Sequence, residues 1–114
     1  MAKAPPDFVY VIAEVRLLAT TEGGKSLPIR GSYRPNHNFF DEADVVMTAG
    51  FIEIPEGQVV EPGEAIVLPI ALWWWTGLDG QIYPGREWRI QEGPTLVGFG
   101  RVIEVVERIG DQRL

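Results

Sequence analysis

Gly-Ser-Tyr-Arg-Pro-Asn-His-Asn-Phe-Phe, residues 31–40, is the most informative stretch of this chain. The glycine permits a tight turn, and Pro35 disfavours the helical conformation for Arg34. Residues 36–40 are therefore expected to extend as a short aromatic strand. The stretch also contains His37, the only histidine in the sequence.

Turn signals recur along the whole chain. Its 13 glycines and 9 prolines interrupt the apolar segments too often for long helices. About six short strands are expected, over residues 8–18, 36–40, 45–54, from 65 to the tryptophans at 73–75, around 88–91 and over 95–106. A closed antiparallel β-barrel is favoured, because closure removes exposed strand edges. The length predicts one domain over residues 1–114, with a core at about 8–107.

Four strand positions carry more specific expectations. Gly50 is expected to form a bulge or bend in its strand. Pro69, which cannot donate to a sheet ladder, is expected at an edge or a bulge. Gly98 and Gly100 share one face of the last strand, where they would allow the bending of a barrel strand.

Composition excludes several classes of function. The absence of cysteine excludes disulfides, thiolate catalysis and cysteine-ligated zinc. A net charge of -6 disfavours sequence-independent binding to nucleic acid, which depends on cations that neutralise phosphates. The longest apolar run, residues 8–18, contains Glu14 and Arg16 and is shorter than the roughly 20 residues of a membrane helix. Because the first residues do not resemble a secretory signal, we expect a cytoplasmic protein outside the membrane.

Catalytic and metal-binding residues are not indicated. His37 has no second histidine or cysteine, and Asp41, Glu42 and Asp44 lack the ligand spacing of a calcium loop. No serine, histidine and aspartate are spaced to suggest a catalytic triad. We therefore predict no catalysis, no cofactor and no metal site, with the acidic run as a solvated connection.

A phosphate-binding loop is also rejected. The string Gly24-Lys25-Ser26 ends like such a loop, but Ala19 stands where the loop needs a glycine. The required helix cannot follow, because Leu27 is succeeded by Pro28. No GTP binding by this chain is expected.

Five motifs occur in a fixed order along the sequence. They are Glu22-Gly23-Gly24-Lys25, Gly31-Ser32-Tyr33-Arg34-Pro35, Ile54-Pro55-Glu56-Gly57, Pro62-Gly63-Glu64, and Ile90-Gln91-Glu92-Gly93 with Val97-Gly98-Phe99-Gly100. In this order and spacing they resemble the C-terminal β-barrel domain of elongation factor Tu, over roughly residues 13–106. The resemblance implies an all-β, six-stranded Greek-key barrel without the GTPase domain of the elongation factor.

The resemblance also implies partners. In that family the barrel helps to grip the acceptor and T arm of aminoacyl-tRNA, packs on the GTPase domain and contacts the exchange factor. The positions that match its RNA contacts are Lys25, where the family has an arginine, the retained Arg34, Asn36 in place of a glutamine, and Gly93. Ser26 replaces a family histidine.

The first candidate site is a rim made of Lys25, Arg30, Arg34, Asn36, His37 and Gly93. Its cations could meet phosphate, and Asn36 and His37 could hydrogen-bond sugar or base edges. The alternative is an ordinary solvated loop on an acidic protein. Both interpretations remain open at the level of sequence.

The second candidate is the run Trp73-Trp74-Trp75. Successive strand residues point to opposite faces, so at least one of these indoles should lie outside the core. An exposed indole could stack on a base or dock a partner's apolar surface. Alternatively, the following loop folds back over it.

Two functions follow from these candidates. The first is a non-catalytic module that binds RNA, tRNA-like or otherwise structured, or a translation component through the rim of residues 25–37 and 93. The alternative is a protein interaction module that uses Trp73 to Trp75, including a homodimer. The sequence does not determine the oligomeric state.

Overall fold

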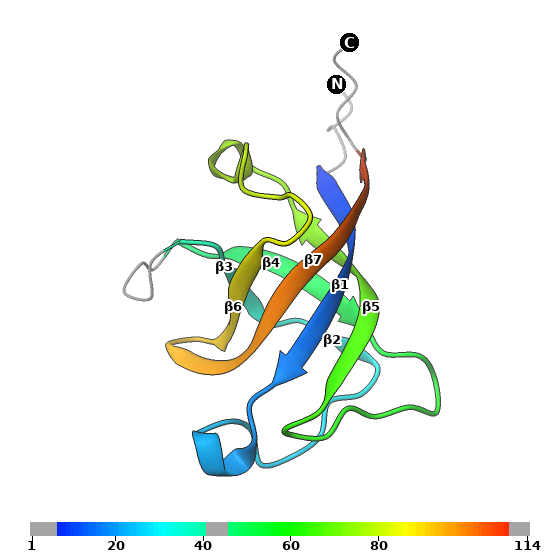
Figure 1. The fold of residues 1–114 in the computed structure, drawn as a ribbon, viewed down its shortest axis with the longest axis vertical. Coiled ribbons are helices and arrows are strands. Elements are labelled where there is room, and N and C mark those ends of the chain that lie inside the picture. The colour runs from blue at the N-terminus through cyan, green and yellow to red at the C-terminus, as the bar shows by residue number, and fades with distance from the viewer. Residues whose placement is uncertain (1–6, 41–45, 110–114) are drawn as a thin grey trace, which may run out of the picture.

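The computed structural model describes residues 7–40 and 46–109, and within them the chain is almost entirely β-structure (Figure 1). The elements are β1 (Phe8–Leu17), the 3-10 turn η1 (Thr20–Glu22), β2 (Ser32–Tyr33), β3 (Asn36–Asn38), β4 (Thr48–Glu53), β5 (Ala65–Trp73), the 3-10 turn η2 (Thr76–Leu78), β6 (Glu87–Glu92) and β7 (Thr95–Ile109). Every strand pair is antiparallel.

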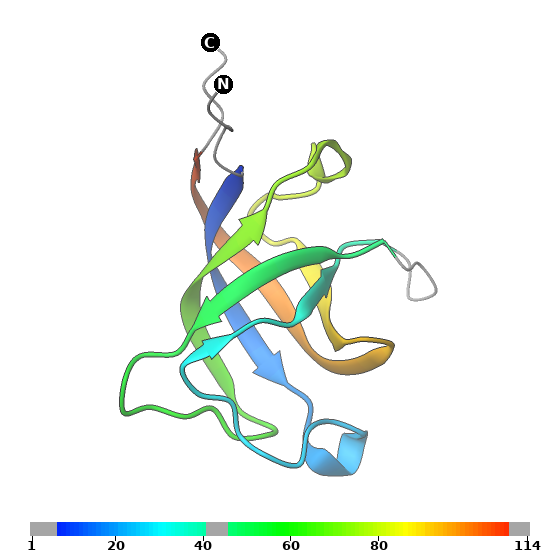
Figure 2. The ribbon, with the colours of Figure 1, turned by 180° about the vertical axis from the view of Figure 1, so that it is seen from behind.

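Six of the strands close into a barrel. Their order is β4-β3-β6-β7-β1-β5, and β5 pairs back with β4, while the two-residue β2 pairs with the last two residues of β4, beyond the part that pairs with β3. Strands β3, β4 and β5 are successive neighbours, and β6 returns to lie beside β3, which is Greek-key connectivity. Figure 2 shows β4 crossing the back of the barrel between β3 and β5. The expected closed antiparallel barrel is confirmed.

Alternation along the strands builds the core. In β1 every second residue from Val9 to Leu17 is buried, and the intervening side chains point outward. The same alternation in β5 buries Leu68, Ile70 and Leu72. Apolar burial of this kind is the main source of stability in a chain without disulfides.

Two glycines of β7 leave room for neighbouring groups in the interior of the barrel. Gly98 and Gly100 both face inward, as expected for one face of a strand. A Cβ on Gly100 would lie 2.3 Å from the indole of Trp88, and one on Gly98 would lie 2.5 Å from the carbonyl oxygen of Arg16. These two glycines therefore allow close packing across the closing strand.

Gly50 does not form the expected bulge. It stays in register with Leu72 of β5, and a Cβ there would lie 2.7 Å from the imidazole of His37. The glycine is needed because a buried ring occupies the side-chain position. By contrast, Pro69 lies just beyond the residues at which β5 pairs with β4, so the expected edge position is correct.

Several strand limits differ from expectation. The strand β2 was not expected, β3 ends at Asn38, β4 begins at Thr48, and β7 continues to Ile109. The acidic residues Asp41, Glu42 and Asp44 lie outside the described residues. Within residues 7–40 and 46–109, no helix is long and apolar enough to cross a membrane.

Candidate functional site

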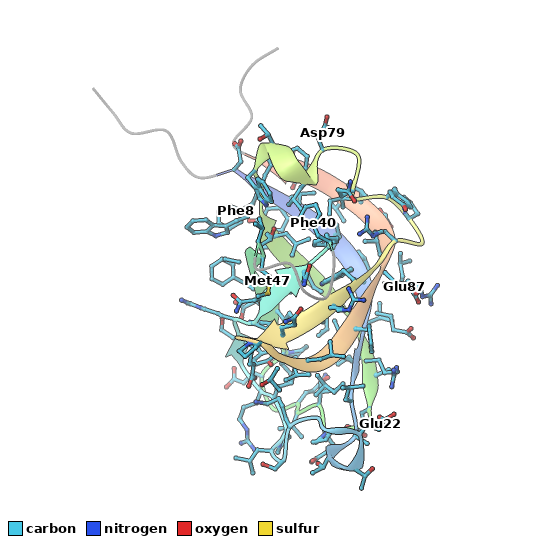
Figure 3. The ribbon with its side chains drawn as sticks, turned by 90° about the vertical axis from the view of Figure 1, so that its left-hand side faces the viewer. Phe8, Glu22, Phe40, Met47, Asp79 and Glu87 are labelled. Carbon is cyan, nitrogen blue, oxygen red and sulfur yellow. The ribbon has the colours of Figure 1, made fainter. Side chains whose placement is uncertain are left out.

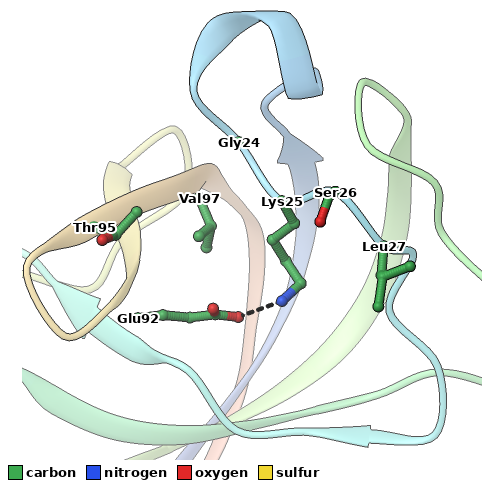
Figure 4. Close-up of a pocket in the computed structure, with 7 residues that line it drawn as sticks. All are labelled: Gly24, Lys25, Ser26, Leu27, Glu92, Thr95 and Val97. Carbon is green, nitrogen blue, oxygen red and sulfur yellow. Dashed lines mark hydrogen bonds and ion pairs between the residues drawn. The ribbon is translucent and has the colours of Figure 1, made fainter.

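Lys25 is held in an ion pair at one end of the barrel. The 3-10 turn η1 is closed by the Glu22 carboxylate, which accepts a hydrogen bond of 2.8 Å from the backbone N–H of Ala19. The chain then places the Lys25 Nζ 2.7 Å from Oε2 of Glu92, on β6 (Figure 4). The hydroxyl of Tyr33 donates to the same oxygen at 2.5 Å. Hydrogen bonds from Lys25 and then Tyr33 hold the pKa of the Glu92 carboxyl below its ordinary value.

A small hollow surrounds this ion pair. It has a volume of about 300 Å³ and is lined by Gly24, Lys25, Ser26, Leu27, Glu92, Thr95 and Val97. Gly93 follows Glu92 in the left-handed region, with φ of +58°. Its carbonyl accepts a hydrogen bond from Gln91, which in turn accepts one from Asn38. The buried amides therefore fix the turn beside the hollow.

The other two cations have different surroundings. The guanidinium of Arg34 lies 4.9 Å from the centre of the Phe51 ring, a cation–π contact on the outside of β4. Arg30 is exposed and lines a separate hollow with residues 55–59. Asn36 is half-buried in β3, opposite Ala49 and Gln91. The three cations of the expected rim therefore have different immediate neighbours.

His37 requires a correction. Its imidazole is 0% exposed, so it cannot hydrogen-bond a ligand at the surface. Nδ1 accepts a 2.9 Å hydrogen bond from the indole N–H of Trp88, and Nε2 lies against Gly50. Burial lowers the pKa of His37 to about 3, and its buried Nε2 has no hydrogen-bond partner among the described residues. The side chain was expected at the surface because a lone polar residue in a short strand gives no sign of the distant glycine that makes room for it.

The three consecutive tryptophans have three different environments. Trp73 ends β5 pointing outward and is 44% exposed, which confirms that at least one indole is external. Trp74 is half-buried and packs against the core. Trp75 is 38% exposed, but its N–H donates to Thr48 and its ring packs against Gly77 of the following loop. The loop therefore packs against part of the Trp75 ring, and Trp73 is the more exposed of the two indoles.

Trp73 belongs to a cluster that we term the aromatic face, made of Phe8, Tyr10, Phe51, Ala71 and Trp73. The centre of the Phe8 ring lies 5.7 Å from that of Trp73, 6.0 Å from that of Phe51 and 6.3 Å from that of Tyr10. Ala71 pairs with both Tyr10 and Phe51, so a small residue lies between the rings. Figure 3 places Phe8 near the end of the barrel opposite Glu22.

The sequence contained a signal for this cluster. Phe8 and Tyr10 occupy alternate positions of β1, and Phe51 stands between the inward Gly50 and Ile52 of β4. These outward positions are apolar, whereas the outward side of a solvated strand is usually polar. Only strand register brings the rings together, because they come from three separate strands.

Comparison with known proteins identifies a relative. The chain is 36% identical over 93 residues to elongation factor Tu 2 from Streptomyces avermitilis, an alignment that covers 82% of this chain and 22% of that protein. The chain therefore spans about a fifth of the length of this relative. No model of a known protein family matches the chain.

Proposed function

We propose that this chain, whose barrel is related to the C-terminal β-barrel domain of elongation factor Tu, is a non-catalytic module of translation that docks a protein partner through its aromatic face. The observation that carries the proposal is the cluster of Phe8, Tyr10, Phe51 and Trp73 on the outside of three adjoining strands. Large exposed apolar patches are uncommon on soluble monomers and generally mark contact surfaces.

The residue types also favour a protein partner. Tryptophan and tyrosine are enriched among residues that dominate binding energy at protein interfaces, and arginine is the third member of that group. All three occur here as Trp73, Tyr10 and Arg34, the last stacked on Phe51. The chain's charge of -6 disfavours a polyanion at a surface with so few cations.

RNA binding through the rim is the second candidate. Its support is that one hollow lies between the Gly24-Lys25 loop and the Glu92-Gly93 turn. Both segments match positions that contact RNA in the elongation factor Tu barrel. Against it, the charge of Lys25 is already paired with Glu92. Under this candidate, Glu92→Gln should free Lys25 and tighten tRNA binding, whereas Lys25→Ala with Arg34→Ala should weaken it and flatten its salt dependence.

The experiment that separates the two functions is affinity capture from a translation-active cell extract with and without ribonuclease. Captured proteins are identified by mass spectrometry, and each is then titrated in purified form against the barrel. We expect one partner whose binding survives ribonuclease and Lys25→Ala but is lost with Trp73→Ala. Thr76→Ala, at an exposed position in η2, is the matched control. Binding that needs RNA and ignores Trp73→Ala would reject the protein-docking function.

A further inference from the structure

We infer that the partner of the aromatic face is a basic amphipathic helix, about four turns long, whose apolar side covers the rings and whose lysines or arginines meet an acidic border. The inference rests on the proposed docking function and adds the chemistry of the partner. It is carried by the extent of the apolar strip and by the charges placed around it.

The strip continues from the aromatic face along β5. The outward residues of β5 from Val67 to Trp73 are all uncharged, and Val67 is 54% exposed. Pro69 is exposed beside the half-buried Ile12 of β1. Six residue steps of a strand span roughly 20 Å, which is the length of a helix of about 13 residues. An amphipathic helix of that length presents an apolar stripe of matching extent.

Acidic side chains border the strip on both sides. On β7, Glu104 stands directly opposite Ile12, and Glu107 stands opposite Tyr10. Residues that face each other across an antiparallel pair share one side of the sheet, so both carboxylates flank the strip and both are exposed. On the other side, Glu53 of β4 lies two residues beyond Phe51 and is exposed.

The opposing charge is smaller. Arg34 is the cation stacked at the aromatic face. Arg101 of β7 lies 3.5 Å from Glu14, so the charges of Arg101 and Glu14 offset each other. Strand β5 contributes no charged side chain. Among the residues that the structure describes, the border therefore carries an excess of negative charge. A helix flanked by lysine or arginine complements it, whereas a second copy of this acidic chain would bring like charges together.

Two synthetic peptides test the inference directly. One is a 14-residue amphipathic helix of leucine and lysine, and the other has glutamate at every lysine position. Binding to the intact chain is measured by fluorescence anisotropy of labelled peptide. We expect the lysine peptide to bind and the glutamate peptide not to bind. Trp73→Ala should weaken binding at least tenfold, since it removes the largest exposed ring.

Substitution of the acidic residues beside the strip provides a second test with the same peptides. Glu104→Gln with Glu107→Gln should weaken the lysine peptide about threefold or more at low salt. Glu56→Gln with Glu87→Gln, two exposed acids outside the border, should leave it unchanged. Tyr10→Ala serves as a second apolar variant if Trp73→Ala fails to fold.

The outcomes separate the inference from the function beneath it. If both peptides bind and Trp73→Ala abolishes both, the face docks apolar segments but the basic partner is wrong. If Trp73→Ala and Tyr10→Ala change neither peptide, both the partner and the docking function are rejected. A concentration-dependent dimer in sedimentation velocity that Trp73→Ala dissociates would also overturn the inference, because the occupant would be a second copy.

Discussion

The Lys25 hollow and the aromatic face differ in how far their groups are already satisfied. In the hollow, Lys25, Tyr33 and Glu92 satisfy one another through an ion pair and a short hydrogen bond. On the aromatic face, Phe8 and Trp73 contact other rings but remain partly open to water. A binding partner would have to break contacts at the first surface and could simply cover the second. Residue type alone is therefore a poor guide to which of these two surfaces binds a partner. Lys25 and Glu92 are already paired with each other, whereas Phe8 and Trp73 remain partly exposed to water.

The largest expected effect compares a buried tryptophan with the outward one. Trp88→Ala should lower the free energy of unfolding by about 3–5 kcal/mol, because it leaves a cavity and removes the donor to His37. Trp73→Ala should lower it by about 1 kcal/mol or less. Urea denaturation followed by circular dichroism measures both. Equal losses would show that Trp73 is a core residue and would remove the basis of the docking surface.

The next effect is the pH dependence that His37 imposes. The pKa of His37 is about 3 in the folded barrel, against 6.5 for a histidine that is free in water. Between these two pH values, the imidazole is therefore protonated in the unfolded chain and neutral in the folded chain. Stability should therefore fall as pH drops below about 6.5, by about 1.4 kcal/mol per unit. Urea titrations between pH 7 and 5 would measure the slope.

The control for this slope is His37→Gln, which keeps an acceptor for Trp88 but does not titrate. Its stability should change much less over the same range. A wild-type slope that persists in His37→Gln would assign the pH dependence to other groups and would undercut the buried neutral imidazole.

A smaller effect should follow from filling the space beside that ring. Gly50→Ala places a Cβ 2.7 Å from His37 and 3.0 Å from the carbonyl oxygen of Ala71. Overpacking of this kind should lower the unfolding free energy by about 1–3 kcal/mol. The control is Ala49→Ser, a small substitution on the exposed side of β4. Gly57→Ser is unsuitable as a control because the φ of Gly57 is +83°, where any side chain is strained. Unchanged stability in Gly50→Ala would mean that the imidazole can move aside.

The smallest effect is expected at the hollow itself. Lys25→Ala should lower the unfolding free energy by about 0.2–1 kcal/mol, because the ion pair is partly exposed to water. The loss should shrink further in 1 M salt, which screens exposed charges. Thermal unfolding at low and high salt measures it. A loss as large as that of Trp88→Ala would instead make the pair a main support of the barrel.

The sequence predicted much of this fold because its signals are local. Alternation in residues 13–17, the glycine and proline turns, and the paired Gly98 and Gly100 each act within a few residues. The same locality explains the failures. Nothing near His37 in the sequence shows that Gly50 and Trp88 will enclose it, since Trp88 lies 51 residues away.

The candidate sites divide along the same line. The outward placement of one indole among Trp73 to Trp75 followed from strand geometry and is confirmed. The assignment of Lys25, Arg30 and Arg34 to one rim rested on nearness in the sequence, and the folded chain gives each a different neighbour. Neighbours in a barrel are set by strand pairing, which sequence distance does not report.

By itself, then, the sequence determined the all-β class, the order of turns and the alternation that fills the core, because backbone conformation and side-chain period are local properties. Tertiary structure alone decided that the His37 side chain is buried and that Glu92 is paired. It also decided that the rings of Phe8, Phe51 and Trp73 meet on the outside of the barrel. The physical reason is that burial and pairing depend on strand register and barrel closure, which bring together residues distant along the chain.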